Sequence, residues 1–170
     1  MDATRWFPAY VALGSNLDDP PAQVERAFTA LAGLRGSHLV ARSSLYRSLP
    51  FGPVAQPDFI NAVAGMLTTL DAAAMLAELK ALEDRLGRER PVVRWGPRRI
   101  DLDLLVHGTT RIDEPQIKVP HPGIAVRAFV LASERVVKYP AARSADSSRI
   151  SPIPSSCGAF GSRGRSPLQY

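Results

Sequence analysis

Cysteine, long apolar runs and nucleotide-binding loops of the P-loop type are scarce or missing in this sequence. Its 170 residues include one cysteine, Cys157, which excludes a disulfide within the chain and favours a reducing, cytoplasmic location. No stretch approaches 18 consecutive apolar residues, and the N-terminus lacks the basic start and apolar run of a signal peptide. We therefore expect no membrane association. The GxxxxGK[ST] pattern is also missing, so a P-loop is excluded as the means of holding a nucleotide.

Positive charge is in excess, but it is unevenly distributed. The net charge is +5, and residues 141–170 contain four arginines and one aspartate, which supply +3 and leave +2 for the rest. This last segment is rich in Ser, Pro, Gly and Arg and has no apolar periodicity, so it is expected to be disordered. The sequence thus predicts one domain over residues 1–140 and a tail over 141–170, and the modest charge of the domain argues against nucleic acid as a partner.

The patterned part of the chain alternates between strand-like and helix-like segments. The turn formers Gly14, Ser15 and Asn16 end the first strand, Asp18 or Asp19 can cap the first helix, and Asp71 starts the second. Strands are predicted from residue 9 up to the turn at 14–16 and at 39–50, 58–70 and 99–108. Helices are predicted at 18–34 and 71–87, followed by a short strand pair within 109–120 and a helix over 122–137. This order predicts an α+β fold, a ferredoxin-like βαββαβ core with helices packed on an antiparallel sheet.

The segment RWGPRRIDLDLLVHG, residues 94–108, places two aspartates inside an apolar strand. Strand alternation puts Asp101 and Asp103 on one face, with Cα atoms roughly 6.6–6.8 Å apart. The other face is apolar and formed by Ile100, Leu102 and Leu104. Carboxylates this close repel each other unless a cation lies between them, and Mg²⁺ prefers one or two carboxylates together with substrate phosphates. Spacing alone leaves open that the aspartates only form the polar face of an edge strand.

Five arginines precede these aspartates within fifteen residues, at 88, 90, 94, 98 and 99. Guanidinium groups stay charged and bind phosphate oxygens in a fork geometry. Together, carboxylates, a divalent cation and arginines indicate a site for a polyphosphate and for phosphoryl transfer.

Several ordered blocks of the sequence resemble the 6-hydroxymethyl-7,8-dihydropterin pyrophosphokinase family of folate biosynthesis. They are YVALGSNL (10–17), SSLYRSLPFG (43–52), QPDFINAV (56–63), LEDRLGRER (82–90), RWGPRRIDLDLL (94–105), VPHP (119–122) and RAF (127–129). The resemblance implies transfer of pyrophosphate from ATP to the hydroxymethyl group of the pterin, with release of AMP and with two Mg²⁺ ions. It implies a monomer whose partners are small molecules, without nucleic acid or membrane.

The resemblance also implies roles for individual residues. Asp101 and Asp103 match the magnesium-binding aspartates, and Arg88 and Arg98 match arginines that contact the phosphates and assist the transfer. The implied pterin site comprises Gly14, Ser48, Leu49, Phe51, Phe59, Asn61, Trp95 and Phe129. The implied nucleotide site comprises Glu83, Arg88, Arg98, Leu104, Lys118, His121 and Arg127.

Two other functions compete with this interpretation. A basic ferredoxin-like chain could be an RNA-binding module, but the aromatic motif of such modules is absent from the sequence. A catalytically impaired relative is the second alternative, because the family usually continues after the RAF block with apolar segments, whereas this chain turns into the Ser/Pro/Gly/Arg tail.

Overall fold

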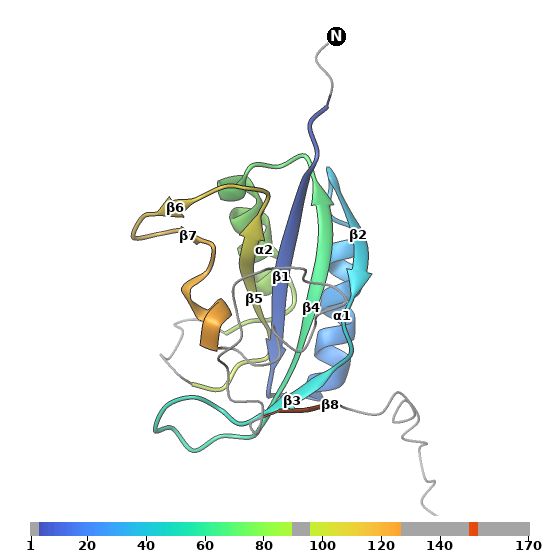
Figure 1. Ribbon diagram of the computed structural model, residues 1–170. Helices are drawn as coiled ribbons and strands as arrows, with labels where there is room; N and C mark the ends of the chain where they lie inside the picture. Colours follow the sequence, from blue (N-terminus) through green and yellow to red (C-terminus); the bar gives the residue numbers. More distant parts are fainter. Residues whose placement is uncertain (1–3, 90–95, 127–149, 153–170) are drawn as a thin grey trace, which may run out of the picture.

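An antiparallel sheet forms the centre of the protein in the computed structural model, which describes residues 4–89, 96–126 and 150–152. Its strands are hydrogen-bonded in the order β5 (Asp101–His107), β1 (Phe7–Ser15), β4 (Phe59–Thr68), β3 (Tyr46–Ser48) and β8 (Ile150–Pro152), and β2 (Ser37–Arg42) also pairs with β4. A separate two-stranded sheet joins β6 (Ile112–Asp113) to β7 (Lys118–Val119) (Figure 1). The predicted short strand pair within 109–120 is thereby confirmed.

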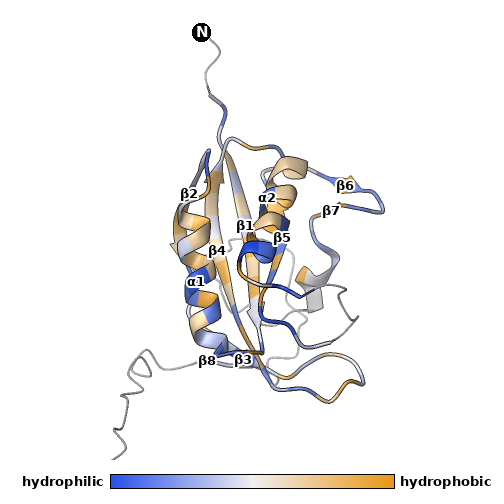
Figure 2. Ribbon diagram, turned by 180° about the vertical axis from the view of Figure 1, so that it is seen from behind, coloured by the Kyte–Doolittle hydropathy of each residue, from blue (hydrophilic) through white to orange (hydrophobic). Residues whose placement is uncertain are grey.

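Two helices, α1 (Pro20–Ala32) and α2 (Ala72–Arg85), cover the same face of this sheet (Figure 2). Each begins at a predicted capping aspartate. Asp19 accepts a hydrogen bond from the backbone N–H of Ala22 at 3.3 Å, and Asp71 accepts one from Ala74 at 2.8 Å. The predicted α+β class is confirmed, and the predicted βαββαβ order differs only in that the second predicted strand is divided into β2 and β3.

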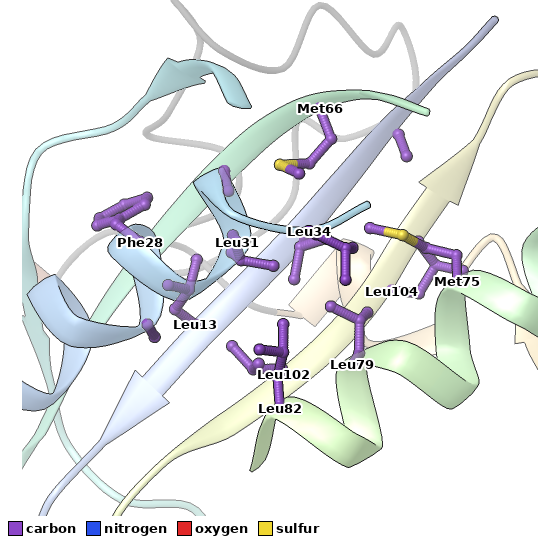
Figure 3. Close-up of a cluster of buried hydrophobic side chains, with 14 of the residues drawn as sticks. Leu13, Phe28, Leu31, Leu34, Met66, Met75, Leu79, Leu82, Leu102 and Leu104 are labelled. Carbon is purple, nitrogen blue, oxygen red and sulfur yellow. The ribbon is translucent and has the colours of Figure 1, made fainter. Parts of the chain in front are cut away.

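The main hydrophobic core lies between the helices and the sheet (Figure 3). Phe28 and Leu31 from α1 and Met75 and Leu79 from α2 are each no more than 1% exposed. The sheet contributes buried side chains from three strands: Val11, Leu13, Ile60, Ala62, Met66, Leu102 and Leu104. A smaller apolar cluster of Ala12, Val63, Leu105, Val106 and Ile124 lies apart from this core.

Strand β5 alternates as predicted over its first half and then bulges. Ile100, Leu102 and Leu104 are buried in the main core, whereas Asp101 and Asp103 are half-buried. The register with β1 shifts between Tyr10 and Val11, so that Leu105 is an extra residue on β5. Leu105 continues the alternation onto the face of the two aspartates and is buried in the smaller cluster there, and the bulge brings Val106 to the same face. The two aspartates lie before the bulge, where the alternation is regular.

Two predicted elements differ in the structure. The strand predicted over 39–50 is divided into β2 and β3, because at Ser43 the side-chain hydroxyl replaces a backbone group and accepts the N–H of Val63 at 2.8 Å. Of the helix predicted over 122–137, residues Pro122–Val126 form a 3₁₀ helix and 127–137 lie outside the described residues.

The tail expected to be disordered contains the strand Ile150–Pro152, and its other residues lie outside the described ones. Among the helices that the structure describes, none is long and apolar enough to span a membrane.

Candidate active site

A cavity opens on the face of the sheet that the helices leave free. Its floor is formed by β1, which carries only small side chains there, Ala12 and Gly14. These two residues pair with Asp103 and Asp101 of β5 on one side, and Gly14 pairs with Asn61 of β4 on the other. Two aspartates on one side and an asparagine on the other thus flank a shallow central strand, which creates the space for a ligand.

The neighbours of Gly14 leave little room for a side chain at this position. A Cβ atom added at Gly14 would lie 3.2 Å from Oδ1 of Asn61 and 3.9 Å from the ring of Phe59. Asn61 is 6% exposed, and its Nδ2 donates to Oγ of Ser48 on β3 at 2.8 Å. The amide of Asn61 is therefore held in place at the edge of the cavity, where it can exchange hydrogen bonds with a flat heterocycle.

Nine of the predicted site residues line this one cavity. They are Gly14, Ser48, Leu49, Phe51, Phe59, Asn61, Arg98, Asp101 and Asp103, together with Ala12 and Leu13, which the sequence analysis did not single out. Leu49 and Phe51 are 55% and 43% exposed. Large apolar side chains left this open beside a polar cavity are well suited to cover an aromatic ligand.

Asp101 is paired with both predicted phosphate-binding arginines. Its Oδ1 accepts from Arg88 at 2.5 Å and its Oδ2 from Arg98 at 2.7 Å. The Arg98 guanidinium also lies 5.6 Å from the centre of the Phe59 ring, within the range of a cation–π contact. Arg98 thus lines the end of the cavity that holds the carboxylates, whereas Arg88 lies behind Asp101 and lines neither this cavity nor the second one described below.

Glu83, at the end of α2, lies beneath this ion-pair cluster. Its Oε1 accepts from Arg88 and from the backbone N–H of Leu102. Burial raises the pKa of Glu83 to about 7, despite the opposing effects of the Leu102 N–H and of Arg88. Burial lowers the pKa of Arg88, but the adjacent Asp101 and Glu83 outweigh that effect and raise it. Glu83 thus orients Arg88, and its predicted contact with the nucleotide stays a prediction.

A second cavity adjoins the first and shares Asp103 with it. The predicted nucleotide residues Leu104, Lys118 and His121 line it. Further lining residues were not predicted, namely Leu76, Lys80, Pro115, Gln116, Ile117, Val119 and Pro122. Lys80 and Leu76 follow a four-residue helical spacing that also fits an ordinary surface of α2, so nothing in the sequence distinguishes them.

Three predicted site residues, Trp95, Arg127 and Phe129, lie outside the described residues. Asn16, by contrast, was predicted only as a turn former, yet it is 2% exposed and hydrogen-bonded to two loops at the site. The sequence alone does not show that this asparagine is buried, so it contains no signal that would have identified Asn16.

The described residues contain no group of three or more His, Cys, Asp or Glu side chains that could enclose a metal ion. Asp101 and Asp103 form a pair of carboxylates instead. A pair of this kind fits magnesium, which keeps several of its ligands as water or phosphate oxygens, better than it fits a metal that needs three or four protein ligands.

Comparison with known proteins agrees with this geometry. The family model described as 7,8-dihydro-6-hydroxymethylpterin-pyrophosphokinase (HPPK) matches residues 10–137. The chain belongs to this family. It is thus a diphosphotransferase of folate biosynthesis, and the family's reaction uses ATP as the donor of pyrophosphate and hydroxymethyldihydropterin as the acceptor.

Relatives from several bacteria carry the name 2-amino-4-hydroxy-6-hydroxymethyldihydropteridine pyrophosphokinase. The Haemophilus influenzae protein is 44% identical over 123 residues, which cover 72% of this chain and 76% of that protein. The Pseudomonas aeruginosa protein is 48% identical over 122 residues, covering 72% and 75%. The Pseudomonas putida protein is 47% identical over 113 residues, covering 66% and 92%. The HPPK resemblance predicted from the sequence blocks is thereby confirmed.

Proposed function

We propose that the chain transfers pyrophosphate from ATP to the hydroxymethyl group of 6-hydroxymethyl-7,8-dihydropterin across the boundary between the two cavities. The observation that carries this proposal is that Asp103 lines both of them. A carboxylate common to two adjacent cavities marks where a group could pass from a ligand in one to a ligand in the other.

The pterin would occupy the cavity over β1. Asn61, held by Ser48, offers an amide to the donors and acceptors along the edge of the ring system, and Phe59 offers an aromatic wall. The nucleotide would occupy the second cavity, where Lys118 and His121 provide polar groups and Leu104 an apolar one. This division supports the assignment of two subsites, each with chemistry suited to one substrate.

The transferred group would lie beside Asp101, Arg88 and Arg98. Magnesium ions, two by analogy with the family, would be held by Asp101 and Asp103 and would neutralise charge on the polyphosphate. Arg98, which lines the first cavity, would bind the oxygens of the transferred pyrophosphate as its bond to the oxygen retained by AMP breaks, and Arg88 would do so from its position beside Asp101. The new bond joins the hydroxymethyl oxygen to the β-phosphorus, and the proton of that hydroxyl is released.

Labelled substrates test the proposal directly. We expect purified protein with Mg²⁺, the pterin and ATP to place label from the γ-phosphate in the pterin product and label from the α-phosphate in AMP. Release of ADP would show transfer of a single phosphate and contradict the proposal. A folded protein that forms no AMP would instead support the alternative of a catalytically impaired relative.

Matched variants link this activity to the carboxylates. Asp103→Asn preserves shape but removes a charge that both cavities share, and we expect kcat to fall by about a hundredfold or more. Mn²⁺ binding, followed by electron paramagnetic resonance, should weaken in parallel. Glu25→Gln removes an exposed carboxylate on α1, which is on the other face of the sheet, and should change neither measurement.

The oligomeric state, the cellular location and the partners of the chain belong to the same proposal. We infer that the chain acts as a monomer in the cytoplasm, without nucleic acid as a partner. Both substrates are small molecules, and the two proposed subsites are formed by residues of one chain, which supports this inference. A mass measured by light scattering that exceeds one chain would contradict the monomer.

A further inference from the structure

Asn16 lies directly after β1, between the loop that leads into β4 and the loop that carries Arg98. Its Nδ2 donates to Oε1 of Gln56 and to the carbonyl of Pro57, each at 3.0 Å. Its Oδ1 accepts the backbone N–H of Arg98 at 2.8 Å, and its own backbone N–H donates to the carbonyl of Arg98 at 3.1 Å. One residue therefore joins three segments that are distant in the sequence.

The orientation of this amide is dictated by its partners. The Arg98 N–H can only donate and the Pro57 carbonyl can only accept, so Oδ1 and Nδ2 cannot be exchanged. Both Nδ2 hydrogens and one lone pair of Oδ1 are in use, and the side chain is 2% exposed. A buried polar group that is satisfied this fully holds its neighbours in one arrangement.

Each of the joined segments carries a group of the site. The Arg98 peptide is held at both its N–H and its carbonyl, and its guanidinium extends from there to Asp101 at 2.7 Å. Pro57 comes two residues before Phe59, which lines the cavity over β1. Asn16 itself does not line that cavity, so it acts on the ligands only through its neighbours.

We propose that Asn16 is a positioning residue that fixes the pterin-side loop, through Gln56 and Pro57, relative to the phosphate-side arginine Arg98. The proposal rests on the proposed function, because it names how the two halves of that site are kept in register. A displacement of about 1 Å between reacting groups can lower the rate by about a hundredfold, so this register bears directly on turnover.

Two variants at this position separate the two connections. Asn16→Asp keeps an oxygen that accepts the Arg98 N–H. It loses both N–H donors, and its second carboxylate oxygen would repel the Pro57 carbonyl oxygen. Asn16→Ala loses both connections of the side chain. Gln56→Ala removes one partner on the pterin side and leaves the contact with Arg98 intact.

Amide hydrogen exchange of the free protein measures how firmly the Arg98 peptide is held, and it needs no substrates. We expect the Arg98 amide to lose protection in Asn16→Ala and to keep it in Asn16→Asp. Equal protection of that amide in wild type and Asn16→Ala would overturn the proposal. Because this readout needs no turnover, it decides the role of Asn16 even if the wild type forms no AMP and the proposed function fails.

Steady-state kinetics then measure how the loss of these hydrogen bonds affects catalysis. Asn16→Asp and Gln56→Ala should raise KM for the pterin about tenfold while changing kcat and the Kd for ATP little. Asn16→Ala should in addition lower kcat by about tenfold to a hundredfold. If Asn16→Ala does not fold, the other two variants still carry the test.

Ser37→Ala serves as the control for a purely structural effect. The Ser37 hydroxyl is buried and bonded to Oγ1 of Thr68 at 2.7 Å, at the end of β4 away from Asn61. This variant should lower Tm without changing KM or kcat. If Asn16→Asp and Gln56→Ala likewise lower only Tm, the proposal is wrong and Asn16 is simply a structural residue.

Discussion

At the scale of single residues, Gly14 decides how much room the cavity has. An added methyl group would lie 3.2 Å from Oδ1 of Asn61, so the asparagine must shift by a few tenths of an ångström. We expect Gly14→Ala to raise the Kd for the pterin about tenfold, measured by fluorescence titration, with little change in Tm. Its control is Gly33→Ala, where the nearest atom, the Ala30 carbonyl oxygen, is 3.6 Å from the added carbon. Unchanged pterin affinity in Gly14→Ala would show that the amide is not used.

Glu83 makes a separate prediction about pH. Its pKa is raised to about 7, mainly because it is buried, whereas in the unfolded chain it is about 4.5. Between these two values the folded protein holds a proton that the unfolded chain has lost, so the free energy of unfolding decreases as pH rises through this window. Glu83→Gln lacks this titration. We therefore expect wild type to lose stability relative to the variant from pH 5 to pH 7, on the order of a few kcal/mol.

Urea unfolding of both proteins at pH 5, 6, 7 and 8 measures this difference. The variant keeps an oxygen for the Leu102 N–H, so the comparison retains that backbone contact. A constant difference in unfolding free energy across the series would contradict the raised pKa. The measurement is made without ligands, so that it reports on the free protein.

The residues of the site differ in how far the sequence predicts them. Strand alternation alone puts Asp101 and Asp103 on one face and indicates a cation site, but it leaves open that they only form the polar face of an edge strand. Asn16 could not be predicted, because its partners Gln56 and Arg98 are 40 and 82 residues away. Contacts at such separation depend on how the strands are ordered, which local patterns do not specify.

At the scale of elements, α2 begins at a capping residue, as local sequence preferences predict. Asp71 accepts the Ala74 N–H at 2.8 Å and so satisfies one of the free donors at the helix terminus. Asp71→Ala should lower the free energy of unfolding by about 1 kcal/mol. Asp71→Ser, which keeps a capping oxygen, should recover most of that loss in thermal melts. Equal melting of the two variants would exclude a capping role.

The elements that differ from prediction do so for reasons of tertiary contact. Ser43 interrupts the segment predicted as one strand because its hydroxyl accepts from Val63, a residue of the neighbouring strand. The bulge at Leu105 depends likewise on the register of β5 against β1. Both features arise where two strands meet, so neither has a signal within its own segment.

At the scale of the whole molecule, the sheet continues beyond β3 through a strand from the tail. In β8, Ile150 pairs with Ser48 and Pro152 with Tyr46. The sequence Ile-Ser-Pro lies among Ser, Pro, Gly and Arg and shows no alternation that would predict a strand. It is a strand because it pairs with the edge of β3, which lies about a hundred residues earlier in the chain. Composition contains no information about such a partner and therefore predicted disorder.

This pairing connects the tail to the pterin side of the site, because Ser48 also accepts the hydrogen bond that holds Asn61. A chain that ends at Arg149 lacks β8 and leaves the outer edge of β3 without that partner. We expect its KM for the pterin to rise severalfold while KM for ATP changes little, because the second cavity contains no residue of β3 or β8. A chain that ends at Pro152 retains the strand and should behave as the full chain does in steady-state kinetics. If both truncated chains show the same increase, the effect comes from residues after 152, and β8 does not support Ser48.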